Sequence, residues 1–440
     1  MFMRGRRQKH SPVPVPSRNA FVPGGRAVTK NGVPGMADAV TVFAILELPM
    51  KRACRRTFLA NLLGATAAVR AASASPALLA QSGPQEAPTQ GGFVPLFNGR
   101  DLAGWVNVNC APGTFTVREG VIVSTGIPTG VLRTDRHYEN FILELEWKHV
   151  RPGGNAGLFV HSEPITAPGV PFAKAIEVQI LDGGSPSGIA TGHGDVFSIH
   201  GAEMIPDRPH PRGWQRCLPS EKRARPAGEW NHYRVESRDG RLTLAVNGKV
   251  VSGASQCRPR RGYLCLESEG SECHFRNLRL QELPSSNPPP SEVAGLDQGF
   301  QSLHNGIDLS GWATSTEHAG HWTAKDWILD CDGKGASRIW TRSQWEDFEW
   351  IADWRMETAQ AGAALLVRGP NAGEVELKAT GKEWSRTVVR LQHGRLEVML
   401  NGQVVIADRD GSKWPSQGPL GLRHSGTPVR FANLYVRALR

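Results

Sequence analysis

The sequence predicts an all-β protein built as two tandem β-sandwich domains. Three observations lead to this prediction. Short stretches that alternate apolar and polar residues recur along the chain, Asn-Gly pairs separate some of them, and a thirteen-residue stretch that begins at residue 93 returns at residue 300. The 49 Gly and 31 Pro among 440 residues favour turns over long helices. No uncharged apolar run approaches the roughly 18 residues that a membrane-spanning helix needs.

The basic excess of the chain is confined to its first 80 residues. The formal net charge is +10. Residues 1–80 hold twelve Lys and Arg but only two acids, Asp38 and Glu47, so the rest of the chain holds 39 basic and 39 acidic side chains. A formally neutral remainder gives no reason to expect nucleic acid or an anionic membrane as a partner.

Residues 50–80 read as an export signal of the twin-arginine type. The pair Arg55-Arg56 stands just before an apolar stretch at 59–69, and small residues follow. A charged region, a short apolar region and a small-residue zone describe a cleavable signal, although a buried amphipathic helix is the alternative. Residues 1–49 are interpreted as a disordered extension or a misassigned start. We therefore expect a periplasmic or extracellular protein.

One long unit occurs twice in the chain. The stretch 93–105 returns as 300–312, with eight of thirteen positions identical at an offset of 207. Later matches have an offset of 154, so the second copy lacks 53 residues, which correspond to about 170–227 of the first. Such a long period indicates homologous domains and not a solenoid. The expected domains are 93–283 and 300–439, joined by a Pro- and Ser-rich linker, 284–299.

The strands expected in each copy alternate in polarity. Residues 141–147, 158–160, 176–180 and 233–236 place apolar side chains at every second position, as a half-buried strand does. Residues 242–251 read as a hairpin with Asn-Gly at its turn, because a type I′ turn needs two residues that tolerate positive φ. Short strands joined by such turns indicate a sandwich.

The cysteines leave the redox and metal chemistry open. Six remain after residue 80, an even number that permits disulfides without fixing their pairing. Cys265 and Cys273 are candidates for a bond across a short hairpin. No CxxC pair or Cys/His spacing indicates zinc, and nothing in the sequence requires a cofactor, so whether a divalent metal binds stays open.

Several motifs, taken in order, resemble one known family. They are the opening Leu-Phe-Asn-Gly-x-Asp-Leu-x-Gly-Trp at 96–105, the strand 141–147, the segments 154–159 and 177–182, and the closing Phe-x-Asn-Leu at 275–278. Together they look like the 3-keto-disaccharide hydrolase domain. The resemblance implies a concanavalin A-like jelly-roll sandwich that cleaves 3-keto-glycosides by lyase and hydratase steps.

That chemistry calls for a base and for polar groups around an enolate. A 3-keto group acidifies the neighbouring C2–H, so a carboxylate or His removes this proton while donors stabilise the enolate oxygen. Ordinary glycosidases instead need two carboxylates that flank the bond. The family motif carries over onto Asn155, Glu177, Gln179 and Asp182. We expect the catalytic residues to be Glu177, His193 and Asp182, and the substrate-binding residues to be Asn155, Gln179, His161, Asp195 and Glu146.

Each candidate on the two expected site strands also has a purely structural interpretation. Glu177 and Gln179 lie on the same face of their strand, because side chains alternate with period two. The alternative to a functional role is that they form the solvated face of an edge strand. Asp182 precedes Gly183-Gly184 and Asn155 follows Gly153-Gly154, so the structural alternative is that both are turn residues. His161 shares the face of Asn155 and is otherwise a surface residue.

The candidates outside these strands have structural interpretations as well. His193 and Asp195 lie in a Gly-rich loop, a setting that often carries functional residues but also occurs at ordinary connections. Glu144 and Glu146 alternate with core residues along one strand, so they face either solvent or a sugar.

The second copy departs from the site pattern. At offset 207, Gly362 replaces Asn155 and Arg368 replaces His161, and the loop that holds His193 has no counterpart. Nine of the thirteen Trp lie in this copy, where they either fill a core or stack on sugar rings. We predict that the first copy is catalytic and that the second is degenerate and serves glycan contact or stability. The competing reading is a non-catalytic carbohydrate-binding protein.

Overall fold

The computed structural model describes residues 92–182, 192–358, 362–378 and 382–440. Within these residues the fold is all-β, with antiparallel sheets and one short 3₁₀ helix, η1 (Pro290–Glu292), so the predicted fold class is confirmed. No helix in this part of the chain is long and apolar enough to cross a membrane. The expected export signal at 50–80 and the segment 1–49 lie outside the described residues.

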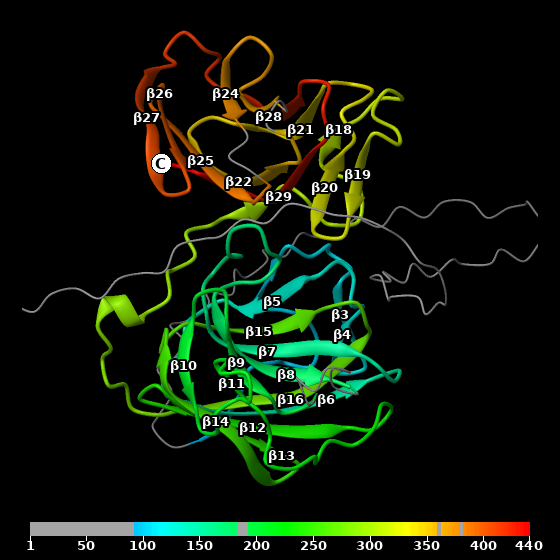
Figure 1. Ribbon diagram of the computed structural model, residues 1–440, viewed down its shortest axis with the longest axis vertical. Coiled ribbons are helices and arrows are strands. Elements are labelled where there is room, and N and C mark those ends of the chain that lie inside the picture. The colour runs from blue at the N-terminus through cyan, green and yellow to red at the C-terminus, as the bar shows by residue number, and fades with distance from the viewer. Residues whose placement is uncertain (1–91, 183–191, 359–361, 379–381) are drawn as a thin grey trace, which may run out of the picture. The chain divides into compact units, whose positions relative to one another are not determined.

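The first half of the chain, residues 93–282, forms two sheets (Figure 1). Sheet 1 contains, in spatial order, β10 (Glu203–Pro206), β14 (Lys249–Arg258), β13 (Arg241–Val246), β12 (Asn231–Arg238), β6 (Phe141–His149), β16 (Cys273–Glu282), β4 (Val121–Ser124) and β3 (Phe115–Arg118), with β1 (Val94–Pro95) beside β16. Sheet 2 contains β11 (Arg216–Cys217), β9 (Val196–Ile199), β8 (Ala175–Leu181), β7 (Asn155–Ser162), β15 (Tyr263–Ser268), β5 (Gly130–Thr134) and β2 (Trp105–Val108).

The second half, residues 301–438, forms two further sheets. Sheet 3 contains β19 (Trp322–Lys325), β20 (Ile328–Cys331), β29 (Val429–Ala438), β22 (Phe348–Met356), β25 (Ser385–Gln392), β26 (Arg395–Leu400) and β27 (Gln403–Asp410), with β17 (Gln301–Ser302) beside β29. Sheet 4 contains β18 (Trp312–Ala313), β21 (Arg338–Trp345), β28 (Gly418–His424), β23 (Gly362–Val367) and β24 (Gly373–Lys378). The strand order of sheet 3 repeats that of sheet 1 without β10.

Alternating polarity builds the core between sheets 1 and 2. Leu145 and Trp147 of β6 join Ile176 and Val178 of β8 in one buried cluster. Full burial of such a side chain stabilises the fold by roughly 1.5–3 kcal/mol. The residues between them in sequence point to the opposite faces of the two sheets, so the polar residues of each strand lie on the outside of the sandwich.

The Asn-Gly turns have the expected geometry. Asn247 and Gly248 join β13 to β14 with φ of +47° and +86°. Asn401 and Gly402 join β26 to β27 with φ of +49° and +79°. Both central residues are left-handed, as a type I′ turn requires, and this turn matches the twist of the two strands that it connects.

The Pro- and Ser-rich segment 284–299 is bound to the first half. Glu139 accepts hydrogen bonds from the hydroxyls of Ser285 and Ser286, and Asp297 pairs with Arg133. These contacts fix the segment along one domain, so it is a strap and not a free spacer.

All six cysteines of the described residues are buried free thiols. The suggested bond between Cys265 and Cys273 is therefore wrong. Cys265 lies on β15 of sheet 2 and Cys273 on β16 of sheet 1, so the short link between them crosses from one sheet to the other. A bond across a hairpin would need both residues in the same sheet.

Candidate functional site

The strand β8 lies inside sheet 2, and its outer face is polar and buried. Ile176, Val178 and Ile180 point into the core, which leaves Glu177 and Gln179 on the outer face. Each of these two side chains is only 6% exposed. Because β8 has β7 and β9 as neighbours, the interpretation as a solvated edge strand is excluded.

The amide of Gln179 connects the polar groups of this face. Its Nε2 donates to Oε1 of Glu177 and to Oδ1 of Asn155, both at 3.2 Å. Its Oε1 accepts from Nη2 of Arg216 at 2.8 Å, and Nε of Arg216 donates to Oδ2 of Asp195 at 2.7 Å. Four of the residues expected from the sequence therefore lie in one network: Asn155, Glu177, Gln179 and Asp195.

Three residues on this face of sheet 2 were missed by the sequence analysis: Arg216, Glu267 and Glu269. Glu269 accepts a hydrogen bond from Nδ2 of Asn155. Glu267 lies on β15, where Leu264 and Leu266 face the core and the intervening side chains face outward. This alternation was readable in the sequence, but it did not show that β15 lies next to β7. Arg216 carried no comparable signal, since its strand has only two residues.

Gly157 makes room for two carboxyl groups. A Cβ at this position would lie 2.9 Å from Oε1 of Glu177 on one side and 2.9 Å from Oε2 of Glu267 on the other. These contacts are closer than side-chain packing normally allows. The glycine thus lets a carboxyl from each neighbouring strand reach across β7, and the two groups flank the same point of the backbone (we call them the carboxyl pair).

Burial and mutual repulsion hold protons on the carboxyl pair. Burial raises the pKa of Glu177 to about 8, with a further contribution from the charge of Glu269. The pKa of Glu267 is raised well above its ordinary value by burial and then by the charge of Glu177. Among the described residues, none forms a hydrogen bond with Oε2 of Glu267. Two close carboxyls in a dry site do not both ionise, so the pair supplies an acid and a base together.

Asp182 and His193 form a separate contact on the core side of sheet 2. Nε2 of His193 lies 3.6 Å from Oδ1 of Asp182, and the imidazole packs at 4.5 Å from the ring of the core residue Trp147. Asp182 comes after β8 ends, with the parity of the core-facing Ile180. We had expected Glu177, His193 and Asp182 to form one catalytic group. The structure instead places Glu177 apart from His193 and Asp182.

His193 suits a structural role, which its titration can test. Burial lowers the pKa of His193 to about 4, and the charge of His149 adds to this effect. A buried neutral His stabilises the fold fully above its unfolded pKa of about 6.5, and this contribution is lost as the pH falls towards 4. We expect His193→Phe to reduce the acid sensitivity of the unfolding free energy between pH 6.5 and 4. Denaturant titrations of both proteins at several pH values measure this difference, and equal slopes would contradict the assignment.

His161 faces the core and not the site. It has φ of +55° beside an irregularity in the pairing of β7 with β15, which reverses the direction expected from strict alternation. The imidazole is 1% exposed and lies 3.1 Å from the carbonyl oxygen of Glu139 and 3.2 Å from Oγ of Ser237. Its expected place on the face of Asn155 is thus incorrect.

Glu146 lies on a different surface from the carboxyl pair. It projects from the outer face of sheet 1, on β6, where Arg276 donates to it at 2.6 Å. Glu144 lies on the same outer face and pairs with Arg234 at 2.8 Å. The two sheets enclose the core between them, so neither residue reaches the substrate position that we had assigned to Glu146.

In the second half an ion pair stands where the first half has the carboxyl pair. The register of β23 with β24 and β28 places Ala364 at the position of Gly157 and Arg423 at that of Glu267. Arg423 binds both Glu374 and Glu376, which correspond to Glu177 and Gln179. The second half therefore has a guanidinium paired with two carboxyl groups at this place, where the first half has two neighbouring carboxyl groups.

The tryptophans of the second half serve mainly as core. Trp312, Trp322, Trp350 and Trp354 are at most 1% exposed and belong to one cluster. Buried indole rings have no face available to a sugar, which removes Trp350 and Trp354 from the candidates for glycan stacking. Among the residues that the structure describes, no group of three or more His, Cys, Asp or Glu has the geometry of a metal site.

Several solved structures are similar to this chain. Two crystal structures of candidate glycosyl hydrolases from Parabacteroides distasonis ATCC 8503 share 24% and 20% identity with it. Each covers 44% of this chain and 94% or 100% of its own, with TM-scores of 0.34 and 0.33. A carbohydrate-binding module from Bacillus subtilis shares 12% identity over 41% of this chain and 96% of its own, with a TM-score of 0.30.

No curated protein matches the chain at a significant level. A family model does match it, over residues 92–281, 299–380 and 374–437, and this match covers most of the chain. The model describes a 3-keto-α-glucoside-1,2-lyase-like domain. The match includes both halves and every residue of the carboxyl pair network. The chain therefore belongs to the family of 3-keto-α-glucoside-1,2-lyase-like domains.

Proposed function

We propose that the protein cleaves 3-keto-glycosides at the carboxyl pair of sheet 2. The observation that carries this proposal is the position of Glu177 and Glu267 on either side of Gly157, with the pKa of both groups raised by burial. An elimination at carbon needs a base and an acid in one dry site. When Glu177 has lost its proton and Glu267 keeps its own, the coupled pair supplies both.

The proposed reaction has two steps that balance. In the first, a carboxylate takes the C2 proton that the 3-keto group acidifies, a C1–C2 double bond forms, and the C1–O bond breaks. The leaving oxygen takes a proton from the carboxylic acid. In the second, water adds across the double bond, with hydroxyl to C1 and hydrogen to C2, and 3-keto-glucose results. The pair returns to its starting protonation state.

Arg216 and the amides support the charged stages of this reaction. The guanidinium of Arg216 is held by Asp195 and Gln179, so its position is fixed before substrate arrives. A fixed cation and oriented amides stabilise an enolate with little reorganisation. We assign Glu177 as the base, because the charge of Arg216 favours its ionised form, whereas burial and two neighbouring carboxylates raise the pKa of Glu267. Glu267 is then the acid.

We place the reaction in the first half and outside the cytoplasm. The ion pair of Arg423 with Glu374 supports a second half that does not carry out this chemistry. The twin-arginine-type segment at 50–80 supports export, so the substrate would be an oxidised sugar of the periplasm or the medium. Contact of the second half with a glycan remains a separate proposal.

A pair of matched glycosides tests the activity. We expect the purified protein to release p-nitrophenol from p-nitrophenyl 3-keto-β- or 3-keto-α-glucoside and to leave the corresponding glucosides intact. Only the keto sugars have an acidic C2–H. Deuterium at C2 should slow release if proton removal limits the rate. Binding of the keto sugars without release would indicate a carbohydrate-binding protein, and equal release from the plain glucosides would indicate an ordinary glycosidase.

A further inference from the structure

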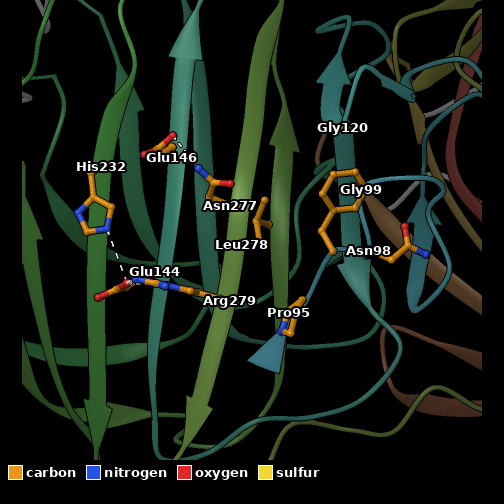
Figure 2. Close-up of a pocket in the computed structure, with 11 residues that line it drawn as sticks. Pro95, Asn98, Gly99, Gly120, Glu144, Glu146, His232, Asn277, Leu278 and Arg279 are labelled. Carbon is orange, nitrogen blue, oxygen red and sulfur yellow. Dashed lines mark hydrogen bonds and ion pairs between the residues drawn. The ribbon is translucent and has the colours of Figure 1, made fainter. Parts of the chain in front are cut away.

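A polar hollow lies on the outer face of sheet 1 (Figure 2). Its volume is about 590 Å³. Strands β6, β12 and β16 form its floor, and the segment 95–99 with the turn at Gly120 borders it. We call it the sheet 1 groove, and its lining residues are Pro95, Phe97, Asn98, Gly99, Gly120, Glu144, Glu146, His232, Asn277, Leu278 and Arg279.

Fixed hydrogen-bonding groups line this groove. Glu144 is held by Arg234 at 2.8 Å and by Arg279 at 2.5 Å. Glu146 accepts from Nδ2 of Asn277 at 3.1 Å. Figure 2 shows both carboxylates on one strand, with His232 and Asn277 on the strands to either side. The ion pairs and hydrogen bonds orient these oxygens and amides without a ligand, so little rotamer freedom is lost on binding.

A bulge in β16 places Asn277 at the surface. Its backbone is left-handed, with φ of +55°, and the pairing of β16 with β6 shifts register between Arg276 and Arg279. Bulges of this kind redirect a side chain and are frequent beside binding sites. The second half keeps the same feature, because Asn433 has φ of +48° and β29 shifts register against β22 at the corresponding place.

In the second half the corresponding residues form hydrogen bonds with a loop of the first half. The registers of β22 and β29 place Asp353 at the position of Glu146 and Asn433 at that of Asn277. Oδ2 of Asp353 accepts from the backbone N–H of Gly169 at 2.7 Å. Nδ2 of Asn433 donates to the carbonyl oxygens of Ala167 at 3.1 Å and Val170 at 2.9 Å. A carboxylate beside a left-handed Asn is thus a working pair of acceptor and donor on this surface.

The first half keeps these polar groups and loses the apolar ones. In the second half, Ile351 and Tyr435 lie in a buried apolar cluster that also contains Phe159 of the first half. Their counterparts are Glu144 and Arg279, which form an ion pair. A protein loop would have to cover that charged pair without apolar compensation. A small ligand that offers many hydroxyls needs only the donors and acceptors.

We propose that the sheet 1 groove is a second saccharide-binding site, separate from the carboxyl pair. Glu146 and Asn277 present an acceptor and a donor to neighbouring hydroxyls, with Glu144 and His232 beside them. The exposed Pro95 supplies apolar surface for the C–H face of a sugar ring. The ligand class is a neutral oligo- or polysaccharide. The proposal does not depend on cleavage of keto sugars.

Affinity electrophoresis through gels with dextran, barley β-glucan or xylan tests this site. We expect at least one polysaccharide to retard the protein. The double variant Glu146→Ala/Asn277→Gly should weaken its retention at least about tenfold, because two hydrogen bonds are lost. Glycine at 277 keeps the left-handed backbone available, so the bulge is preserved. A melting curve confirms that the variant is folded.

Two further variants identify the surface that binds. Glu236→Gln removes a carboxylate from the same sheet outside the groove, and it should leave retention unchanged. Asn155→Ala alters the network of the carboxyl pair and should also leave it unchanged. The proposal is overturned if no named polysaccharide retards the protein, if the folded double variant is retarded like the parent, or if Asn155→Ala abolishes retention.

Discussion

Glu177→Gln is expected to lower kcat/KM for a p-nitrophenyl 3-keto-glucoside by about 10²–10⁴-fold, the usual contribution of a general base. Glutamine has the size of glutamate and still accepts from the amide of Gln179, so the network around it persists. What it cannot do is take a proton. Steady-state release of p-nitrophenol measures the loss, and circular dichroism with a melting curve confirms that the fold is retained.

The second half offers a matched control for this substitution. Glu374 occupies the position of Glu177 in the corresponding strand, where Arg423 pairs with it. Glu374→Gln should therefore leave kcat/KM within about twofold of the parent. If the two variants lost activity equally, the assignment of the reaction to the first half would fail. If Glu177→Gln kept full activity, Glu177 would not be the base, whichever reaction the protein catalyses.

The strand pattern of the sequence was sufficient to predict the fold and part of the site. Alternation along 176–180 fixed which side chains of β8 share a face, and this placed Glu177 with Gln179 correctly. The same rule assigned the opposite parity to the apolar residues, which form the core. Strand parity is a local property, because each Cβ alternates with the backbone that carries it. The face on which a side chain lies can therefore be predicted without knowing which strands are neighbours.

The partners of Glu177 depend on strand order, which the sequence does not contain. Glu267 lies 90 positions further along the chain, and only the placement of β7 between β8 and β15 brings the two carboxyls together. Nothing in the sequence distinguished Gly157, although this residue leaves the space for both carboxyls. Long-range pairing decides such contacts, and a single sequence carries no signal for it.

The positions expected for His161 and Glu146 were wrong for different physical reasons. His161 obeyed period two in the sequence, but an irregular backbone with positive φ turns it inward. Glu146 follows the alternation in the structure as well. Alternation alone, however, does not say to which of the two sheets of a sandwich a strand belongs. Its strand belongs to sheet 1, so the groove that it lines is a separate surface from the carboxyl pair.

Glu267→Gln is expected to abolish most activity and to stabilise the protein at alkaline pH. The folded pKa of Glu267 is raised well above the unfolded value near 4.5, by burial and then by Glu177. A raised carboxyl pKa means that the folded state holds its proton more tightly than the unfolded state does. The stability of the parent therefore falls as the pH rises above about 4.5 towards the folded pKa. Glutamine cannot ionise, so the variant avoids this loss.

Activity should fall by about 10²-fold or more, because the proposed leaving group loses its proton donor. Denaturant titrations at pH 4, 7 and 9 should show nearly equal unfolding free energies at pH 4 and an increasing advantage of the variant above it. Glu272→Gln, which changes a partly exposed carboxylate after β15, should alter neither quantity appreciably. A variant that loses stability at every pH would show that Glu267 holds the fold together, whereas a loss of activity with a gain of alkaline stability separates its role as an acid from any role in packing.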